Sequence, residues 1–116
     1  MNKYTIDKND NIESVIQKIL YNNHRTILVL DSKKVVGTIS EGDILKSIIY
    51  KKKFNAKLVS IMNKNFIYLE YKNYTKKDIH KIFAKHLCGL IPIIDKKMNL
   101  KEVISLEDYL KNIKQI

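Results

Sequence analysis

Two spacings of apolar residues alternate along the first half of the chain, and each predicts a different element. Over residues 10–22 the apolar positions recur at i, i+3, i+4, i+7 and i+8, which predicts a helix with one buried face. Asp10 and Glu13 are in position to cap the start of that helix. The uninterrupted apolar run at 26–30 instead predicts a strand buried on both faces, and a second run at 35–39 completes a hairpin with it.

A short strand is expected at 3–6, before this unit. A helix from Glu41 is expected after it, ending at the lysines at 51–53, because cations suit a helix C-terminus. The connector at 54–64 carries a short helical turn. Pro92 lacks an N–H group, so we expect it at an edge or at a gap in a ladder. The same spacings predict five further elements: a strand at 66–69, a helix at 75–87 capped by Thr75, strands at 90–94 and 100–104, and a helix from Leu106.

The two halves of the chain are copies of one another. Ser40 and Asp43 recur 65 residues later as Ser105 and Asp108, each pair at the junction of a predicted strand and helix. Such a period indicates duplication of a supersecondary unit. Each copy is too short to build a sufficient core alone, so the copies should share one. We therefore predict one module of two repeats, at 1–60 and 61–116.

Composition places the chain among ordinary soluble proteins. It has 116 residues, of which 45% are hydrophobic and 29% charged. No apolar run approaches the roughly 20 residues of a membrane span, and the N-terminus does not resemble a signal peptide. The single cysteine, Cys88, excludes an internal disulfide and fits a reducing compartment. We expect a cytoplasmic protein with no membrane partner.

The net charge of +10 changes this picture only slightly. Nearly all the positive charge is lysine spread along the chain, and Arg25 is the only arginine. A nucleic-acid binder more often concentrates arginine and aromatic residues on one element. The pattern therefore argues against nucleic acid and fits an anionic small ligand or an acidic protein surface equally well.

The candidate chemistry lies at the two Ser-x-x-Asp junctions. Taken alone, this spacing more often marks a helix cap. The serine hydroxyl accepts a hydrogen bond from a backbone N–H group of the first helical turn, and the acid accepts one from the backbone N–H group of the serine. A hydroxyl and a carboxylate at a helix start also suit a sugar diol and a phosphate, and the duplication favours that alternative. Elsewhere, His80, His86 and Cys88 match no common zinc spacing. We predict no catalytic residue, metal or cofactor.

At these junctions the chain resembles a tandem pair of CBS domains, also called a Bateman module. The first copy carries the resemblance at 27–31 and 36–45, and the second copy carries it at 90–95 and 103–108. The resemblance implies an α/β (α+β) fold of two strand-helix-strand-strand-helix repeats packed about a pseudo-twofold axis. One departure is that the family's glycine before the serine is present as Gly37 but replaced by Glu102 in the second copy.

The resemblance also implies two ligand clefts and a role for each matched residue. In the first, Asp43 would accept from ribose hydroxyls, Ser40 would hold a phosphate or ribose oxygen, and Arg25 would bind a phosphate. The walls of that cleft would be Tyr4, Thr5, Thr26 and Ile27. The second cleft would consist of Ser105, Asp108, Phe66, Ile67, Leu90 and Ile91. Gly89 replaces Arg25 there, so a cation would come from Lys85 or His86, and we rank the Asp43 site higher.

The function implied is regulatory. Such a module would sense an adenine nucleotide, AMP, ADP or ATP, and control a partner or fused enzyme. The motif at 37–43 is also similar to CBS pairs fused to sugar-phosphate nucleotidyltransferase domains, and the chain ends after its last helix as a module of a larger protein would. Wide apolar helix faces predict a homodimer. The alternative is a structural dimerisation module with empty clefts.

Overall fold

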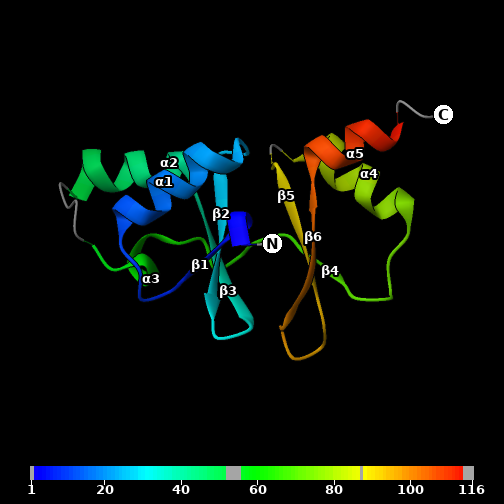
Figure 1. Ribbon diagram of the computed structural model, residues 1–116, viewed down its shortest axis with the longest axis horizontal. Coiled ribbons are helices and arrows are strands. Elements are labelled where there is room, and N and C mark those ends of the chain that lie inside the picture. Colours follow the sequence, from blue (N-terminus) through cyan, green and yellow to red (C-terminus); the bar gives the residue numbers. More distant parts are fainter. Residues whose placement is uncertain (1, 52–55, 87, 114–116) are drawn as a thin grey trace.

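Two three-stranded sheets with the same strand order form the framework of the computed structural model, which describes residues 2–51, 56–86 and 88–113 (Figure 1). In each sheet the first strand lies parallel to the central strand, and the third lies antiparallel to it. The first repeat consists of β1 (Thr5–Asp7), α1 (Ile12–Asn22), β2 (Thr26–Asp31), β3 (Lys34–Ser40) and α2 (Glu41–Lys46). The second consists of β4 (Leu69–Glu70), α4 (Lys76–Lys85), β5 (Leu90–Ile94), β6 (Leu100–Ser105) and α5 (Leu106–Ile113).

Three short elements complete the order. A 3-10 turn, η1 (Asn2–Tyr4), precedes β1, and a π-helical turn, η2 (Ser47–Lys51), extends α2. The connector forms α3 (Leu58–Ile61). The predicted fold class is therefore confirmed, with the strand-helix-strand-strand-helix order in both repeats. Figure 1 shows the helices of both repeats along one side of the molecule and the two hairpins along the other.

Several local predictions differ from the structure. The cap of α1 is Asn11, whose side chain accepts from the Ser14 N–H group, rather than Asp10 or Glu13. Phe66 lies before β4 and outside any strand. β5 is a central strand, so Pro92 does not lie at an edge, but β4 pairs only with Ile93 and Ile94, which leaves a gap in that ladder opposite Pro92. The predicted ends of two helices, at 52–53 and at Leu87, fall outside the described residues.

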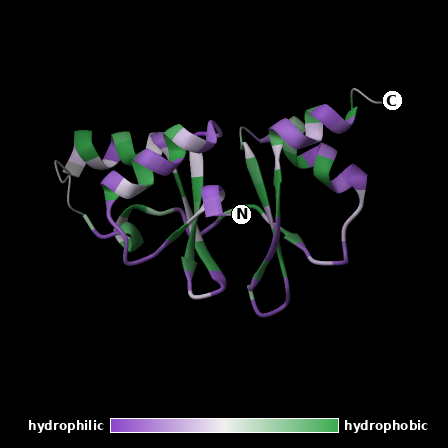
Figure 2. Cartoon of the chain, viewed as in Figure 1, coloured by the Kyte–Doolittle hydropathy of each residue, from purple (hydrophilic) through white to green (hydrophobic). Residues whose placement is uncertain are grey.

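The larger core belongs to the first repeat. Its central strand places Ile27 and Val29 against Val15 of α1, and all three are fully buried. Leu58 and Ile61 of α3 complete the same cluster although they precede the second repeat. Figure 2 shows the strands hydrophobic along much of their length and the hairpin turns hydrophilic.

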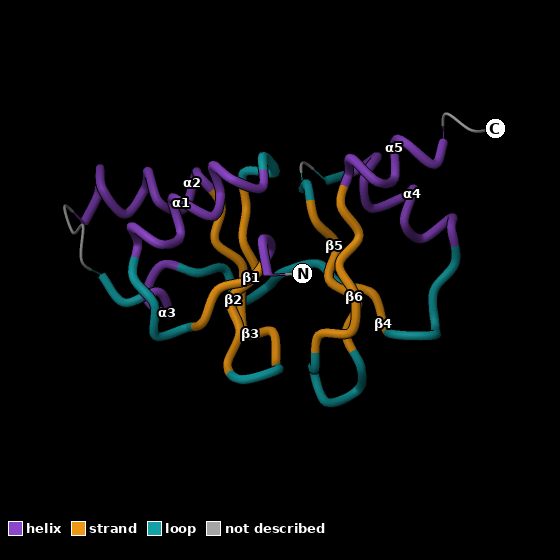
Figure 3. The backbone as a smooth tube through the Cα atoms, in the orientation of Figure 1, coloured by secondary structure: helices purple, strands orange, loops and turns teal. Residues whose placement is uncertain are grey.

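A backbone crossing explains the glycine of the first repeat. After α3 the chain passes along β3, where Thr38 and Asn63 exchange two main-chain hydrogen bonds of 3.0 and 2.8 Å. A Cβ atom at Gly37 would lie 2.7 Å from Met62 Sδ and 3.1 Å from the Asn63 carbonyl oxygen. Figure 3 shows this connecting loop running across the middle of the molecule to reach β4. Gly37 therefore serves a close backbone approach.

The repeats are joined at two levels below their helices. The hairpin turns meet through main-chain hydrogen bonds, Val35 N–H to Met98 O at 3.0 Å and Leu100 N–H to Lys33 O at 2.9 Å. Above them lies a small apolar cluster drawn from both repeats, which consists of Tyr4, Leu28 and Leu90 with Leu100 and Val103 against them. Among the described residues, no helix is long and apolar enough to cross a membrane.

Candidate functional site

A cleft of about 700 Å³ opens between the repeats beside the start of α2. Its volume falls within the range of small-molecule sites, roughly 300–1,000 Å³. The first repeat contributes mostly polar residues and the second mostly apolar ones. The polar lining includes Arg25, Thr26, Thr38, Ser40, Glu41 and Asp43. The apolar lining includes Leu28, Phe66, Ile67, Phe83, Leu90 and Leu106.

Ser40 and Asp43 form a reciprocal capping box at the polar wall. Asp43 Oδ2 accepts from the Ser40 N–H group at 2.9 Å and from Ser40 Oγ at 3.0 Å, while the Asp43 N–H group donates to Ser40 Oγ at 3.2 Å. The cap therefore uses one carboxylate oxygen. The other, Oδ1, makes no hydrogen bond to the described part of the chain and belongs to a half-buried side chain on the cleft. Capping and ligand binding are thus compatible at this residue.

Arg25 lies on the rim of the same wall. Its backbone has a φ of 60°, and its carbonyl accepts from the Glu41 N–H group at 3.0 Å, which ties the rim to the start of α2. The guanidinium is exposed and makes no ion pair within the described residues. Thr26, the next residue, is held by a hydrogen bond from Oγ1 to the Ile39 carbonyl at 3.2 Å. A free arginine thus borders the pair of Ser40 and Asp43.

The apolar wall corrects the predicted division of residues between clefts. Phe66, Ile67 and Leu90 were assigned to the Asp108 site, but they line the cleft of Asp43. The pairing of Asn63 with Thr38 causes this, because it lays the chain just before Phe66 against the first repeat. Several other predicted wall residues lie outside the cleft and are buried, namely Tyr4, Thr5, Ile27 and Ile91.

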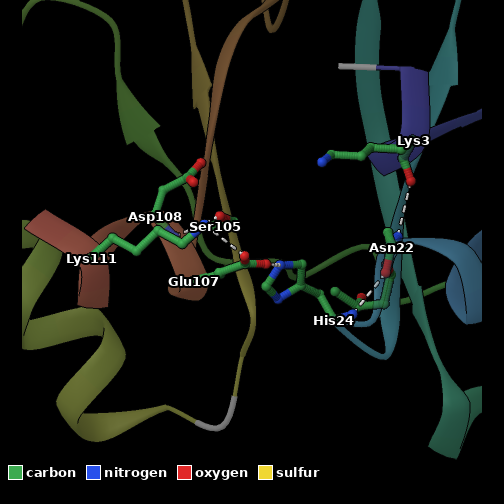
Figure 4. A network of polar contacts seen from close by, with 8 residues as sticks. Lys3, Asn22, His24, Ser105, Glu107, Asp108 and Lys111 are labelled. Atoms are coloured by element: carbon green, nitrogen blue, oxygen red, sulfur yellow. Dashed lines mark hydrogen bonds and ion pairs between the residues drawn. The ribbon is translucent and has the colours of Figure 1, made fainter.

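The second Ser-x-x-Asp junction has a different geometry. Ser105 is buried, and its Oγ accepts from the Asp108 N–H group at 3.1 Å, but the described structure has no return bond from the Asp108 carboxylate to Ser105. In Figure 4 no dashed line joins the Asp108 carboxylate to Ser105. Asp108 is exposed. The two junctions are therefore equivalent in sequence but not in side-chain arrangement.

Glu107 links this second junction to the first repeat. Its Oε1 accepts from Lys111 Nζ at 3.0 Å, and its Oε2 lies 3.9 Å from His24 Nε2 (Figure 4). The Lys111 ammonium holds the pKa of Glu107 below its usual range, and the same contact raises the pKa of Lys111. Glu107 is consequently ionised at neutral pH.

His24 also explains why the second copy lacks an arginine. A Cβ atom at Gly89, the counterpart of Arg25, would lie 2.9 Å from the His24 carbonyl oxygen and 3.0 Å from its Cβ atom. The two equivalent turns face each other across the repeats, and there is space for a side chain on only one. His86, predicted as a replacement cation for the Asp108 site, lines the Asp43 cleft instead.

Sequence reasoning missed some of the lining residues. His24 and Asn63 gave no signal of their own, because their positions depend on how the repeats face each other. Cys88 also lines the cleft, and partial burial raises the pKa of its thiol. Among the described residues, no group of three or more histidine, cysteine, aspartate or glutamate side chains could hold a metal ion.

Comparisons with known proteins bear on the family of the first repeat and on the fold. Residues 1–50 match the model of the CBS domain, so a CBS domain is present in the first part of the chain. A comparison with curated proteins found none that matches. The fold is that of CBS-pair structures. A CBS domain pair/ACT domain protein (TM0892) from Thermotoga maritima is 14% identical, with a TM-score of 0.75 over 96% of this chain and 88% of that one.

Two further structures share the fold. CBSX2, solved in complex with AMP, is 13% identical, with a TM-score of 0.76 over 96% of this chain and 87% of that one. Protein MJ1225 from Methanocaldococcus jannaschii, titled a candidate archaeal homolog of g-AMPK, is 20% identical with a TM-score of 0.81. The match covers 94% of this chain and 43% of MJ1225.

Proposed function

We propose that this protein is a regulatory module that binds an adenine nucleotide in the cleft between its repeats. The observation that carries the proposal is the opposition of two walls, with Asp43 and Arg25 on one and Phe66 and Ile67 on the other. A nucleotide has the matching parts, since its base is flat and apolar on its faces while its sugar and phosphate are polar. The AMP complex of CBSX2, which has the same fold, supports the choice of adenine.

Each wall has a defined task in this proposal. Asp43 Oδ1, which the cap leaves free, accepts from the ribose hydroxyls. Arg25 donates paired hydrogen bonds to a phosphate, because a guanidinium matches two phosphate oxygens. Phe66 and Ile67 pack against the base. The second junction, where Glu107 is already paired and Asp108 points outward, is the weaker candidate, so we expect one nucleotide per chain at low concentration.

The module acts on a partner and catalyses no reaction itself in this proposal. The CBS domain is generally regulatory rather than catalytic. The two walls come from different repeats, so a ligand that bridges them changes how the repeats face each other. That change would reach a regulated enzyme, fused or separate, and a sugar-phosphate nucleotidyltransferase domain remains our proposal for it.

A homodimer is part of the same proposal. Helix residues on one side of the first repeat leave large apolar side chains exposed, namely Ile16, Leu20, Tyr21, Leu45, Ile49 and Tyr50. Figure 2 shows green, hydrophobic stretches on α2 and the segment after it. Apolar faces of this kind mark association sites in soluble proteins. Without a nucleotide in the cleft, this surface alone would support the alternative function, a structural dimerisation module.

Calorimetry decides between the two functions. We expect heat of binding when AMP, ADP or ATP is titrated into the protein at tens of micromolar, with no conversion of the nucleotide on prolonged incubation. A ligand that binds only the folded state also raises the melting temperature. If none of the three nucleotides gives heat or a melting shift, the nucleotide proposal fails and the structural module replaces it.

A further inference from the structure

His24 carries an unexplained polar atom at the boundary between the repeats. Its side chain is 8% exposed, and its Nε2 atom is buried without a hydrogen-bond partner. Buried polar atoms are nearly always paired, so an unpaired one calls for a reason. The nearest oppositely charged group is the Glu107 carboxylate of α5, with Oε2 at 3.9 Å from Nε2. That distance is too long for a hydrogen bond and short enough for an ion pair to tighten.

The groups that face His24 come from two other elements. The Tyr4 ring of η1 lies 5.8 Å away, centroid to centroid, and Lys3 of the same turn acts on the Glu107 carboxylate. On α5, one carboxylate oxygen of Glu107 is paired with Lys111, and the other oxygen faces His24 (Figure 4). Because Lys111 lowers the pKa of Glu107, the carboxylate is charged across the range in which an imidazole titrates.

The turn that carries His24 is also the rim of the ligand cleft. Asn23 and Arg25, on either side, both have a φ of 60°. Within the first repeat the turn is fixed by the His24 N–H group, which donates to Asn22 Oδ1 at 2.8 Å, and by the bond from the Glu41 N–H group to the Arg25 carbonyl. Toward the second repeat it is fixed by the His24 side chain against Gly89 and Glu107.

We propose that His24 is a positioning residue for the ligand cleft: its imidazole fastens the rim at 23–25 to α5 of the second repeat, and protonation tightens that contact. A protonated Nε2 donates to the free Glu107 oxygen, which pairs the buried atom and draws the two walls together. A neutral imidazole has no charge to attract the Glu107 carboxylate, so the contact is weaker. Arg25, the next residue, then meets the phosphate from a better fixed rim, a step that rests on the proposed function.

Thermal unfolding without ligand tests the contact itself. Glu107→Gln keeps the shape of the side chain and removes its charge. We expect it to lower the melting temperature more at about pH 5.5 than at about pH 8, by a further 2 °C or so, because only the protonated imidazole uses the charge. Lys111→Met is the matched control, since it removes the other partner of Glu107 and its effect should not depend on pH in this range.

The double variant His24→Gln/Glu107→Gln tests whether His24 is the histidine that causes the pH dependence. In the His24→Gln background the pH-dependent part of the Glu107→Gln effect should vanish, although the other two histidines, His80 and His86, are still present. The contact is overturned if Glu107→Gln lowers the melting temperature equally at both pH values, or if the difference survives in the His24→Gln background.

The positioning role needs a second measurement. We expect the ratio of AMP affinities, wild type over Glu107→Gln, to be at least about threefold larger at pH 5.5 than at pH 8. The phosphate's own titration cancels in this ratio. An equal ratio at both pH values overturns the positioning role even if the contact is present. If AMP binds no variant, the proposed function fails, while the melting experiment still decides the His24–Glu107 contact.

Discussion

Thr75 and Asp78 form at the start of α4 the same reciprocal pair of hydrogen bonds that Ser40 and Asp43 form at the start of α2. The Thr75 N–H group donates to Asp78 Oδ2 at 2.9 Å, and the Asp78 N–H group donates to Thr75 Oγ1 at 3.3 Å. Asp78 does not line the cleft. The described residues therefore include two capping boxes of one chemistry, of which one faces the proposed ligand.

This pair allows capping and binding to be separated. Asp43→Asn keeps an oxygen for the cap and loses the charge, so we expect the free energy of unfolding to fall by only about 0.5–1 kcal/mol. Binding of AMP should weaken at least tenfold, which takes only about 1.4 kcal/mol. Asp78→Asn is the control, with a similar change in melting temperature and unchanged affinity. Equal affinity in both variants would restrict Asp43 to capping.

Cys88 offers a direct probe of the cleft. Because burial raises the pKa of its thiol, little thiolate is present at neutral pH, and reaction with Ellman's reagent should be slow there and accelerate as the pH rises. Saturating AMP should slow the reaction further at constant pH. The rate of colour release measures both effects, and a rate that AMP does not change would place the nucleotide elsewhere.

Any side chain at Gly37 should lower the free energy of unfolding. In Gly37→Ala the new methyl group meets Met62 and the Asn63 carbonyl, so we expect a loss of about 1–3 kcal/mol from crowding. Gly42→Ala is the control, because its Cβ atom would meet only Ser40 Oγ at 3.6 Å, an ordinary contact. Urea unfolding of both variants measures the difference between their free energies of unfolding. Equal values would contradict the close approach of Met62 and Asn63 to Gly37.

The exposed faces of α2 and its extension predict how dimers can be disrupted. Leu45 and Ile49 are 57% and 63% exposed, and placing a charge there should cost nothing in the monomer. Leu45→Glu combined with Ile49→Glu should convert dimers to monomers in sedimentation velocity at about 100 micromolar. Val59→Glu, at an exposed apolar residue of α3, should leave assembly unchanged. A wild type that sediments as a monomer would remove the dimer from the proposal.

The elements themselves were predictable because their causes are local. The spacing over 10–22 and the apolar runs around Ile27 and Ile91 gave helices and strands close to those observed. The cap of α1 was missed by one residue, since Asp10, Asn11 and Glu13 are all chemically able to cap and only backbone geometry selects Asn11. The strand expected at Phe66 starts only at Leu69, where its partner Ile93 follows Pro92, which offers no N–H group.

The cleft was only half predictable. Ser40, Asp43, Arg25 and Thr26 come together as expected because they flank two neighbouring strands, and such proximity follows from the hairpin. Which apolar residues face them depends on the path of the chain between repeats. Nothing in the pattern around Asn63 indicates that its backbone pairs with Thr38.

Because of the path that the chain takes between the repeats, the segment that was duplicated and the segment that forms a complete core have different boundaries. Leu58 and Ile61 of the connector α3, which lie beyond the last helix of the first repeat, fill the core of that repeat. A half-chain that stopped short of them would leave a cavity among Val15, Ile27 and their neighbours, so the first repeat needs the connector to complete its core. The shortest segment that could fold as the first repeat therefore ends after α3, and not after the extension of α2.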